Sequence, residues 1–178
     1  MQVEETANMA LYVVATPIGN DKDLSERAKQ VLATVPTLIG EEKREIEIRL
    51  KRWNITNKKI ELLNEHSKKR DLEDLLAIAK REDMALITDC GTPGFCDPGH
   101  QLVDLCRKAN ISVIPVPGAS SLMTLLSVVS QRVDRFNFAG FLPANSEKRI
   151  TELKRLSRSP DVVILMDTPY RLQKTLQE

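Results

Sequence analysis

The fold is decided by one stretch of the chain, Thr88-Asp89-Cys90-Gly91-Thr92-Pro93-Gly94-Phe95-Cys96-Asp97-Pro98-Gly99, which directly follows an apolar run at residues 84–87. Three glycines and two prolines fall within these twelve residues. Glycine permits positive φ and close backbone approach, whereas proline stiffens the chain and removes a donor. A helix-like segment follows, so the loop presents its backbone N–H groups at the carboxyl end of a sheet, where open α/β sheets bind ligands. The stretch predicts a ligand-binding loop; a purely structural turn is the alternative.

Short β-like segments alternate with longer α-like segments on both sides of this loop. Apolar residues recur at helical spacing between the expected strands, as in Ile46, Leu50 and Trp53. The first helix is expected to be capped by Asp23, with Glu26 in capping-box spacing. Strands are expected at residues 11–15, 37–40, 59–63, 84–88 and 111–115. Five strands that alternate with helices predict an α/β fold with a mostly parallel sheet and helices on both faces.

This rhythm breaks at Val116-Pro117-Gly118-Ala119-Ser120-Ser121, where a Pro-Gly pair and small hydroxyl residues suit a linker that ends at a helix N-cap. We expect two α/β domains, residues 11–115 and 119–178, hinged near residues 116–119. Strands at 135–141 and 161–166 and a basic helix at 147–158 are expected in the second domain. That domain has only about 60 residues, so its core is marginal without a partner or further residues.

Composition limits the class of protein. The formal net charge is +1, with 42% hydrophobic and 29% charged residues, which is ordinary for a globular protein and by itself suggests no polyanion partner. No apolar run approaches the ~20 residues that cross a bilayer. The polar residues 1–10 hold no apolar signal core. We expect a cytoplasmic protein without a membrane partner.

The cysteines are too few for a disulfide framework, since there are three. Cys90, Cys96 and His100 cluster in sequence and could hold a metal ion, but their spacing does not match a paired zinc motif. Packed, reduced thiols are the commoner role of such residues. We therefore expect no metal site.

Five short segments stand in a particular order, at residues 15–20, 89–94 with 97–99, 117–121, 140–143 and 168–171. Together they resemble the tetrapyrrole methylase superfamily over about residues 11–178. The similarity is greatest to the branch that methylates a ribose 2′-hydroxyl of small-subunit ribosomal RNA. The resemblance implies a homodimeric, two-domain methyltransferase that binds S-adenosyl-L-methionine between its domains and acts on ribosomal RNA or the small ribosomal subunit. The cofactor-binding residues that it implies are Pro17, Asp89, Gly91, Thr92, Pro93, Phe95, Ser120, Ser121 and Asp167.

Two carboxylates are candidates for catalysis. Glu41 stands at the end of the second strand and could face the cleft; a charged helix start, favoured by the helix dipole, is the alternative. Asp97 could orient an acceptor hydroxyl, or it could cap the helix that begins at Gly99. Acceptor contacts are expected from Asn20, Arg44, Arg149 and Arg155. The last two belong to the basic helix. This helix could contact the phosphates of a nucleic acid, or its charges could simply form a solvated helix face.

Two departures from the RNA-methylase branch keep other functions open. The branch usually shows Glu-Asp-Thr-Arg after the second strand, where this chain has Glu41-Glu42-Lys43-Arg44. Its members also continue with further strands beyond the position of Arg171, so part of the adenine pocket is expected to be absent. One alternative is a methyltransferase acting on a tetrapyrrole carbon, although aromatic residues make up only 4% of the chain. The other is a non-catalytic descendant that binds S-adenosyl-L-methionine.

Overall fold

Parallel strands form the centre of the first of two units into which the chain divides, Met1–Ser121 and Leu122–Glu178. The structure, a computed structural model, describes residues 9–94, 97 and 99–178. Within those residues, the strands of the first unit are β1 (Ala10–Val14), β2 (Thr37–Gly40), β3 (Lys59–Leu62), β4 (Met84–Leu86) and β5 (Ser112–Val116). They pair in the order β3-β2-β4-β1-β5, which confirms the predicted five-stranded parallel sheet. The predicted hinge at residues 116–119 falls inside this unit.

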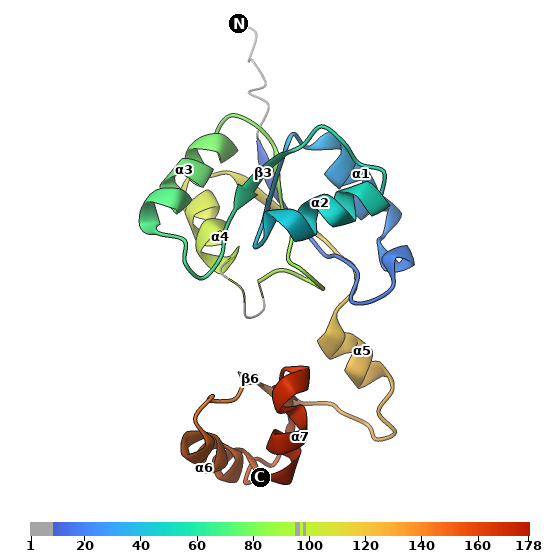
Figure 1. Cartoon of the computed structure of the whole chain (residues 1–178), viewed down its shortest axis with the longest axis vertical. Coiled ribbons are helices and arrows are strands. Elements are labelled where there is room, and N and C mark those ends of the chain that lie inside the picture. The colour runs from blue at the N-terminus through green and yellow to red at the C-terminus, as the bar shows by residue number, and fades with distance from the viewer. Residues whose placement is uncertain (1–8, 95–96, 98) are drawn as a thin grey trace, which may run out of the picture. The chain divides into compact units, whose positions relative to one another are not determined.

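Helices cover both faces of the sheet (Figure 1). They are α1 (Glu26–Thr34), α2 (Lys43–Arg52), α3 (Lys69–Ala79) and α4 (Gly99–Lys108). The chain runs from β1 through β2 to β3 in one direction across the sheet and returns through β4 to β5, so right-handed crossovers change face at β3. Leu32 of α1 and Leu50 of α2 accordingly lie in one core, and Leu75 of α3 and Leu102 of α4 lie in the other.

The amino end of α1 differs from the sequence prediction. Asp23 does not cap this helix but ends a 3-10 turn, η1 (Asp21–Asp23), which the side chain of Asn20 caps by accepting from the Lys22 N–H at 3.1 Å. Ser25 has extended backbone angles, so its hydroxyl oxygen is the group that reaches the Ala28 N–H, at 3.1 Å. The cap therefore lies two residues later than Asp23.

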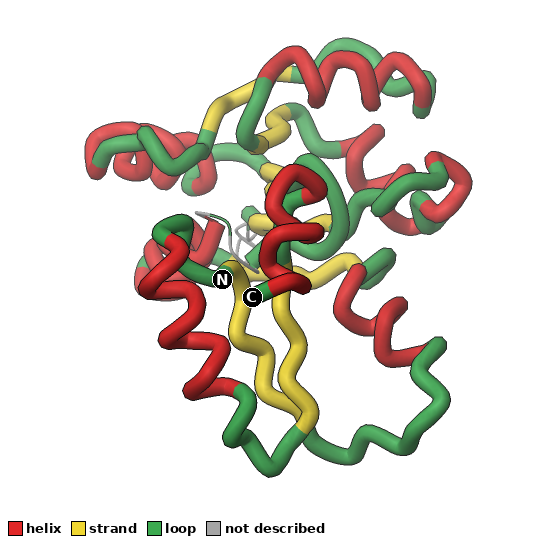
Figure 2. Tube along the Cα trace, turned by 60° about the horizontal axis from the view of Figure 1, so that its bottom comes forward, coloured by secondary structure: helices red, strands yellow, loops and turns green. Residues whose placement is uncertain are grey.

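The second unit contains β6 (Phe136–Phe141) and β7 (Val162–Met166), which pair in parallel and lie side by side in Figure 2. Its helices are α6 (Ser146–Leu156) and α7 (Pro169–Gln177), and α5 (Ser121–Ser127) leads into it. Several large apolar side chains stay exposed in this unit, including Val128 at 76% and Leu176 at 78%. No helix in the described part of the chain is long and apolar enough to cross a membrane.

Candidate functional site

The loop after β4 leaves the sheet at a point where neighbouring connections diverge. In the sheet order, β4 lies between β2 and β1, whose following helices cover one face, whereas α4 covers the other. Such a divergence opens a crevice outside the carboxyl ends of the strands, and open α/β sheets bind ligands there. The predicted ligand loop, residues 88–99, begins at this position, and the structure describes it at residues 88–94, 97 and 99.

Hydrogen bonds join the loop after β4 to the loop after β1. The Thr16 N–H donates to the Gly91 carbonyl at 2.9 Å, and the Gly91 N–H donates back to the Thr16 carbonyl at 3.1 Å. The Thr16 hydroxyl also donates to the Thr88 carbonyl at 3.1 Å, and the Thr16 residue is only 1% exposed. Gly91 has φ of 83°, a conformation that glycine adopts without the steric cost of a Cβ. Sequence analysis missed Thr16, because only the register of the fold places its hydroxyl over the Thr88 carbonyl.

The loop after β5 joins the same assembly. The Ala15 N–H donates to the Val116 carbonyl at 3.1 Å, and the Thr92 hydroxyl donates to the Ala119 carbonyl at 3.0 Å. Gly118 packs so closely that an added Cβ would lie 2.9 Å from the Cβ of Ala15. The three loops that follow β1, β4 and β5 therefore form one hydrogen-bonded structure. Five of the predicted cofactor residues lie in its loops after β1 and β4, namely Pro17, Asp89, Gly91, Thr92 and Pro93.

The remaining predicted cofactor residues lie in different parts of the chain. Phe95 lies outside the described residues. Ser120 is half-buried, and the exposed Ser121 is the first residue of α5. Asp167, in the second unit, accepts hydrogen bonds from the Thr175 hydroxyl at 2.5 Å and from Arg171 Nε at 2.8 Å. These bonds, with one from the Thr168 N–H, hold the pKa of this carboxyl below its usual value. Asp167 therefore stabilises the amino-terminal part of α7 through hydrogen bonds.

Glu41 follows β2 and faces the acidic side of the loop after β4. Partial burial, followed by the charges of Asp89, Asp97 and Glu65, raises the pKa of the Glu41 carboxyl above its ordinary value, although a hydrogen bond from the Asp89 backbone opposes the rise. The Asn64 side chain donates to the Glu41 carbonyl at 3.4 Å, which ties the end of β2 to the loop after β3. A carboxyl group with a raised pKa at this edge is suited to proton transfer near neutral pH.

Asp97, the second catalytic candidate, holds backbone together. Its carboxylate accepts from the Gly94 N–H at 2.6 Å and from the Gly99 N–H at 2.9 Å. A Cβ on Gly99 would lie 2.8 Å from the Asp97 Oδ1. This geometry supports the alternative in which Asp97 caps α4 and fixes the preceding loop.

Of the predicted acceptor residues, Asn20 caps η1, Arg44 is exposed in the first turn of α2, and Arg155 is exposed and paired with Glu152 at 2.6 Å. The prediction that Arg149 belongs to an exposed basic face is wrong, because this residue is only 2% exposed. It lies seven positions before the buried Leu156, on the inward face of α6.

The Arg149 guanidinium is fully engaged inside the second unit. It donates to the Glu178 carboxylate at 2.6 and 2.8 Å and to the carbonyls of Pro143 at 3.1 Å and Ala144 at 2.8 Å. The two bonds from Arg149, followed by a hydrogen bond from the Ser146 hydroxyl, lower the pKa of the Glu178 carboxyl to about 2. Arg149 therefore stabilises the second unit and offers no free face to a phosphate.

The cysteines also divide between surface and core. Cys90 is exposed, whereas Cys106 is buried on α4, and burial raises the pKa of its thiol to about 11. Cys96, one of the three ligands considered for a metal, lies outside the described residues. Within the described ranges, no group of three His, Cys, Asp or Glu side chains could hold a metal ion.

Comparison with known proteins identifies related sequences along the whole chain. A family model described as Tetrapyrrole (Corrin/Porphyrin) Methylases matches residues 10–178. The ribosomal RNA small subunit methyltransferase I of Escherichia coli O157:H7 is 36% identical, over 99% of this chain and 62% of its own length. The protein of the same name from Synechocystis is 39% identical, over 94% of this chain and 60% of its own length. The chain thus spans about three fifths of the length of these relatives.

Two solved structures share the fold. Uroporphyrin III C-methyl transferase from Thermus thermophilus superposes with a TM-score of 0.63 at 17% identity, covering 94% of this chain and 76% of that one. Diphthine synthase superposes with a TM-score of 0.66 at 18% identity, covering 90% of this chain and 65% of that one. The parallel sheet, the joined loops at its carboxyl edge and the family model lead to one conclusion: the chain belongs to the tetrapyrrole methylase family.

Proposed function

We propose that the chain is part of an S-adenosyl-L-methionine-dependent methyltransferase that methylates a ribose 2′-hydroxyl of small-subunit ribosomal RNA. The observation that carries this proposal is the joining of the loops after β1, β4 and β5 at a divergence point of the sheet. The names of the relatives support the choice of ribosomal RNA as the acceptor. A ribosomal substrate would place the reaction in the cytoplasm.

The loops have the character that this cofactor needs. The cofactor combines a sulfonium cation, a zwitterionic tail and an adenine, and when bound it supplies a methyl group on a good leaving group. Gly91 at positive φ and the close-packed Gly118 keep Cβ atoms away from the backbone of two loops. The hydroxyls of Thr16 and Thr92 donate to the carbonyls of Thr88 and Ala119, which fixes the shape of the three loops. Pro17, Asp89, Gly91, Thr92 and Pro93 would hold the cofactor from the first unit, with Phe95, Ser120, Ser121 and Asp167 as further predicted contacts.

Glu41 is the residue that we assign to accept the proton of the acceptor hydroxyl. It lies at the carboxyl end of β2, beside the loop that would hold the cofactor, and its raised pKa makes it a stronger base than an exposed glutamate. Asp97 fixes the loop through the Gly94 and Gly99 N–H groups. Alignment of the hydroxyl with the methyl group would supply most of the acceleration, since proximity and orientation dominate such displacements.

A second copy of the chain is the proposed partner in an assembly. Exposed apolar side chains of the second unit support this homodimer, and they include Met123 at 60% and Tyr170 at 96%. Light scattering at micromolar concentration should report twice the mass of the chain. A mass of one chain at every concentration tested would contradict the proposal.

The test of function is transfer of a labelled methyl group from S-adenosyl-L-methionine to small ribosomal subunits from cells that lack this protein. Label should appear at a ribose 2′-oxygen, and the transfer rate should fall by about two orders of magnitude or more in Glu41→Gln. Glu42→Gln is the matched control, because Glu42 is the exposed neighbour and makes no side-chain capping bond. If a tetrapyrrole is offered in a parallel reaction, label in the tetrapyrrole and none in RNA would replace the proposal with the tetrapyrrole alternative. Absence of transfer together with retained cofactor binding would favour a non-catalytic descendant.

A further inference from the structure

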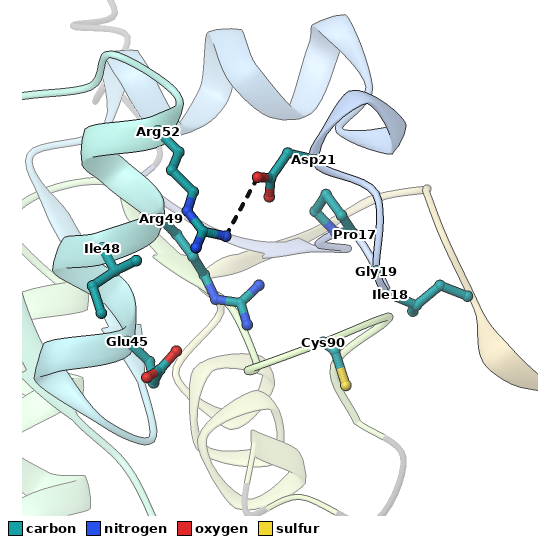
Figure 3. A pocket seen from close by; sticks show the side chains of 9 residues that line it. All are labelled: Pro17, Ile18, Gly19, Asp21, Glu45, Ile48, Arg49, Arg52 and Cys90. Carbon is teal, nitrogen blue, oxygen red and sulfur yellow. Dashed lines mark hydrogen bonds and ion pairs between the residues drawn. The ribbon is translucent and has the colours of Figure 1, made fainter.

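A groove lies beside the three joined loops, entirely within the first unit (Figure 3). The loop after β1 and η1 form one wall, and α2 forms the other. Its volume is about 380 Å³. Pro17 and Cys90 line it and also belong to the loops after β1 and β4, so the groove borders the proposed cofactor site.

Two arginines of α2 reach this groove, Arg49 and Arg52, which are three positions apart and so share a helix face. Arg52 Nη1 lies 3.4 Å from Asp21 Oδ2, and the two side chains are 60% and 47% exposed. An ion pair this exposed contributes little to stability. Arg52 is therefore able to exchange Asp21 for a better acceptor at small cost.

Arg49 lacks a partner for a buried donor. Its Nε is buried and, among the residues that the structure describes, has no hydrogen-bond partner. Glu45, one turn earlier on α2, is the nearest candidate by helix spacing, yet no ion pair joins the two side chains in the described structure. Figure 3 shows the Arg49 guanidinium directed into the groove, on the side of Cys90. A charged group without an acceptor is costly, and no ion pair joins Arg49 to a carboxylate among the residues that the structure describes, so its guanidinium in the groove indicates an anion supplied by a ligand.

We propose that this groove binds one phosphate of the acceptor RNA chain through Arg49 and Arg52. The inference rests on the proposed function for its substrate class. The planar guanidinium presents paired donors that match the oxygens of a phosphate. Asp21 and Glu45 balance the two arginines in formal charge, so the groove recognises an anion by donor geometry and does not attract polyanions in general. Its position beside Pro17 and Cys90 would hold the acceptor strand next to the cofactor loops.

Binding of a fluorescein-labelled, single-stranded oligoribonucleotide, followed by anisotropy over a series of salt concentrations, tests the proposal in the full chain. Arg49→Gln and Arg52→Gln should each weaken binding by about tenfold, which is the effect of removing a charge-assisted hydrogen bond. Each change should also reduce the slope of log affinity against log salt by about 0.7, the value for one phosphate contact on a single strand. Arg81→Gln is the matched control, because Arg81 is exposed just before β4, at the opposite edge of the sheet, and it should change neither quantity.

Two further measurements separate this proposal from the proposed function. Inorganic phosphate should raise the Tm of the wild type and of Arg81→Gln more than that of Arg49→Gln, whether or not RNA is the substrate. Affinity for S-adenosylhomocysteine should be the same in all variants. If phosphate raises the Tm of the wild type and Arg49→Gln equally, and RNA affinity is unchanged in the variant, the phosphate site would be overturned and the methyltransferase proposal would stand. Loss of S-adenosylhomocysteine binding in Arg49→Gln, with RNA binding intact, would overturn it in favour of a cofactor carboxylate. If phosphate raises the Tm of Arg49→Gln less than that of the wild type, but the wild type transfers no methyl group to RNA, the anion site would be supported and the proposed function would be contradicted.

Discussion

Gly118 controls how closely the loop after β5 approaches the loop after β1, and Gly118→Ala is the sharpest test of that contact. The added Cβ would lie 2.9 Å from the Ala15 Cβ and 3.4 Å from the Ala15 carbonyl oxygen. Carbon atoms prefer about 3.5–4.0 Å, so the loops would have to separate by roughly 1 Å. Ala15 is 2% exposed and bonded through its N–H to the Val116 carbonyl, which leaves it little freedom to move.

The expected magnitude follows from two opposing effects. Overpacking of this kind costs about 1–3 kcal/mol. The φ of Gly118 lies outside the left-handed region, so alanine meets no backbone strain there and restricts the unfolded chain, a gain of about 0.4–1 kcal/mol. We therefore expect the free energy of unfolding to fall by about 1–2 kcal/mol.

A double-mutant cycle with Ala15→Gly identifies the cause. Ala15→Gly alone should cost about 1 kcal/mol, because it loosens the chain and loses a buried methyl group. It also removes the atom that clashes, so the double mutant should be about 1 kcal/mol more stable than the sum of the single effects predicts. Gly19→Ala is the control, since nothing lies within 4 Å of the added Cβ, and it should be neutral or slightly stabilising.

Urea denaturation followed by tryptophan fluorescence measures these effects in the relevant unit. The single tryptophan, Trp53, is 5% exposed in the core between α2 and the sheet, so its emission reports unfolding of the first unit. Calorimetry with S-adenosylhomocysteine should show weaker binding to Gly118→Ala and recovery in the double mutant. Additive free energies in the cycle, or a Gly118→Ala protein as stable as Gly19→Ala, would refute the close contact.

Three further predictions concern charged groups. The pKa of Glu41 is raised in the folded protein, so the protonated carboxyl stabilises the fold below the unfolded pKa, ~4.3, and this stabilisation is lost as pH rises through the folded pKa. Glu41→Gln should therefore raise the Tm at pH 8 but not at pH 4. Equal Tm shifts at the two pH values would contradict the raised pKa. The pKa of Glu178 is lowered to about 2, so its bond to Arg149 should stabilise the second unit at neutral pH and lose this effect as pH falls toward 2. The difference in stability between wild type and Glu178→Gln, followed by circular dichroism, should vanish over that range. Asp97→Ala should cost about 0.5–2 kcal/mol in urea denaturation, because the Gly94 and Gly99 N–H groups lose their acceptor; a stable Asp97→Ala that cannot transfer methyl groups would instead restore the catalytic interpretation.

The sheet and its helices could be predicted because each depends on local periodicity. Residues such as Ile46, Leu50 and Trp53 recur at the spacing of one helix face, and all three are buried. Arg149 could not be placed in the same way. Charge indicates a surface position by default, and its partner Glu178 lies 29 residues away in sequence.

The glycines show the same limit. Gly91 was predicted as a loop residue from local composition, and its φ of 83° agrees with the local rule. The importance of Gly118 comes instead from Ala15, a residue at the far end of the first unit's sequence, which only the pairing of β1 with β5 brings beside it. The position of Arg49 in a groove could not be predicted from local sequence either, because the groove depends on where the loop after β1 passes α2.

The strand order itself separates the kinds of chemistry along the sheet edge. β5, β1 and β4 are neighbours, and their loops present mostly backbone groups held by hydrogen bonds. β2 comes next in the order and is followed by Glu41, whose pKa is raised first by partial burial and then by the carboxylates of the adjacent loop. Beyond β2 the chain enters α2, where Arg49 and Arg52 line the groove. A transfer from a cationic donor to a hydroxyl of an anionic chain requires a neutral or acidic site for the donor, a base for the proton and cations for the phosphate. In the proposed reaction the loops of the sheet edge would supply the first two, and α2 would supply the cations.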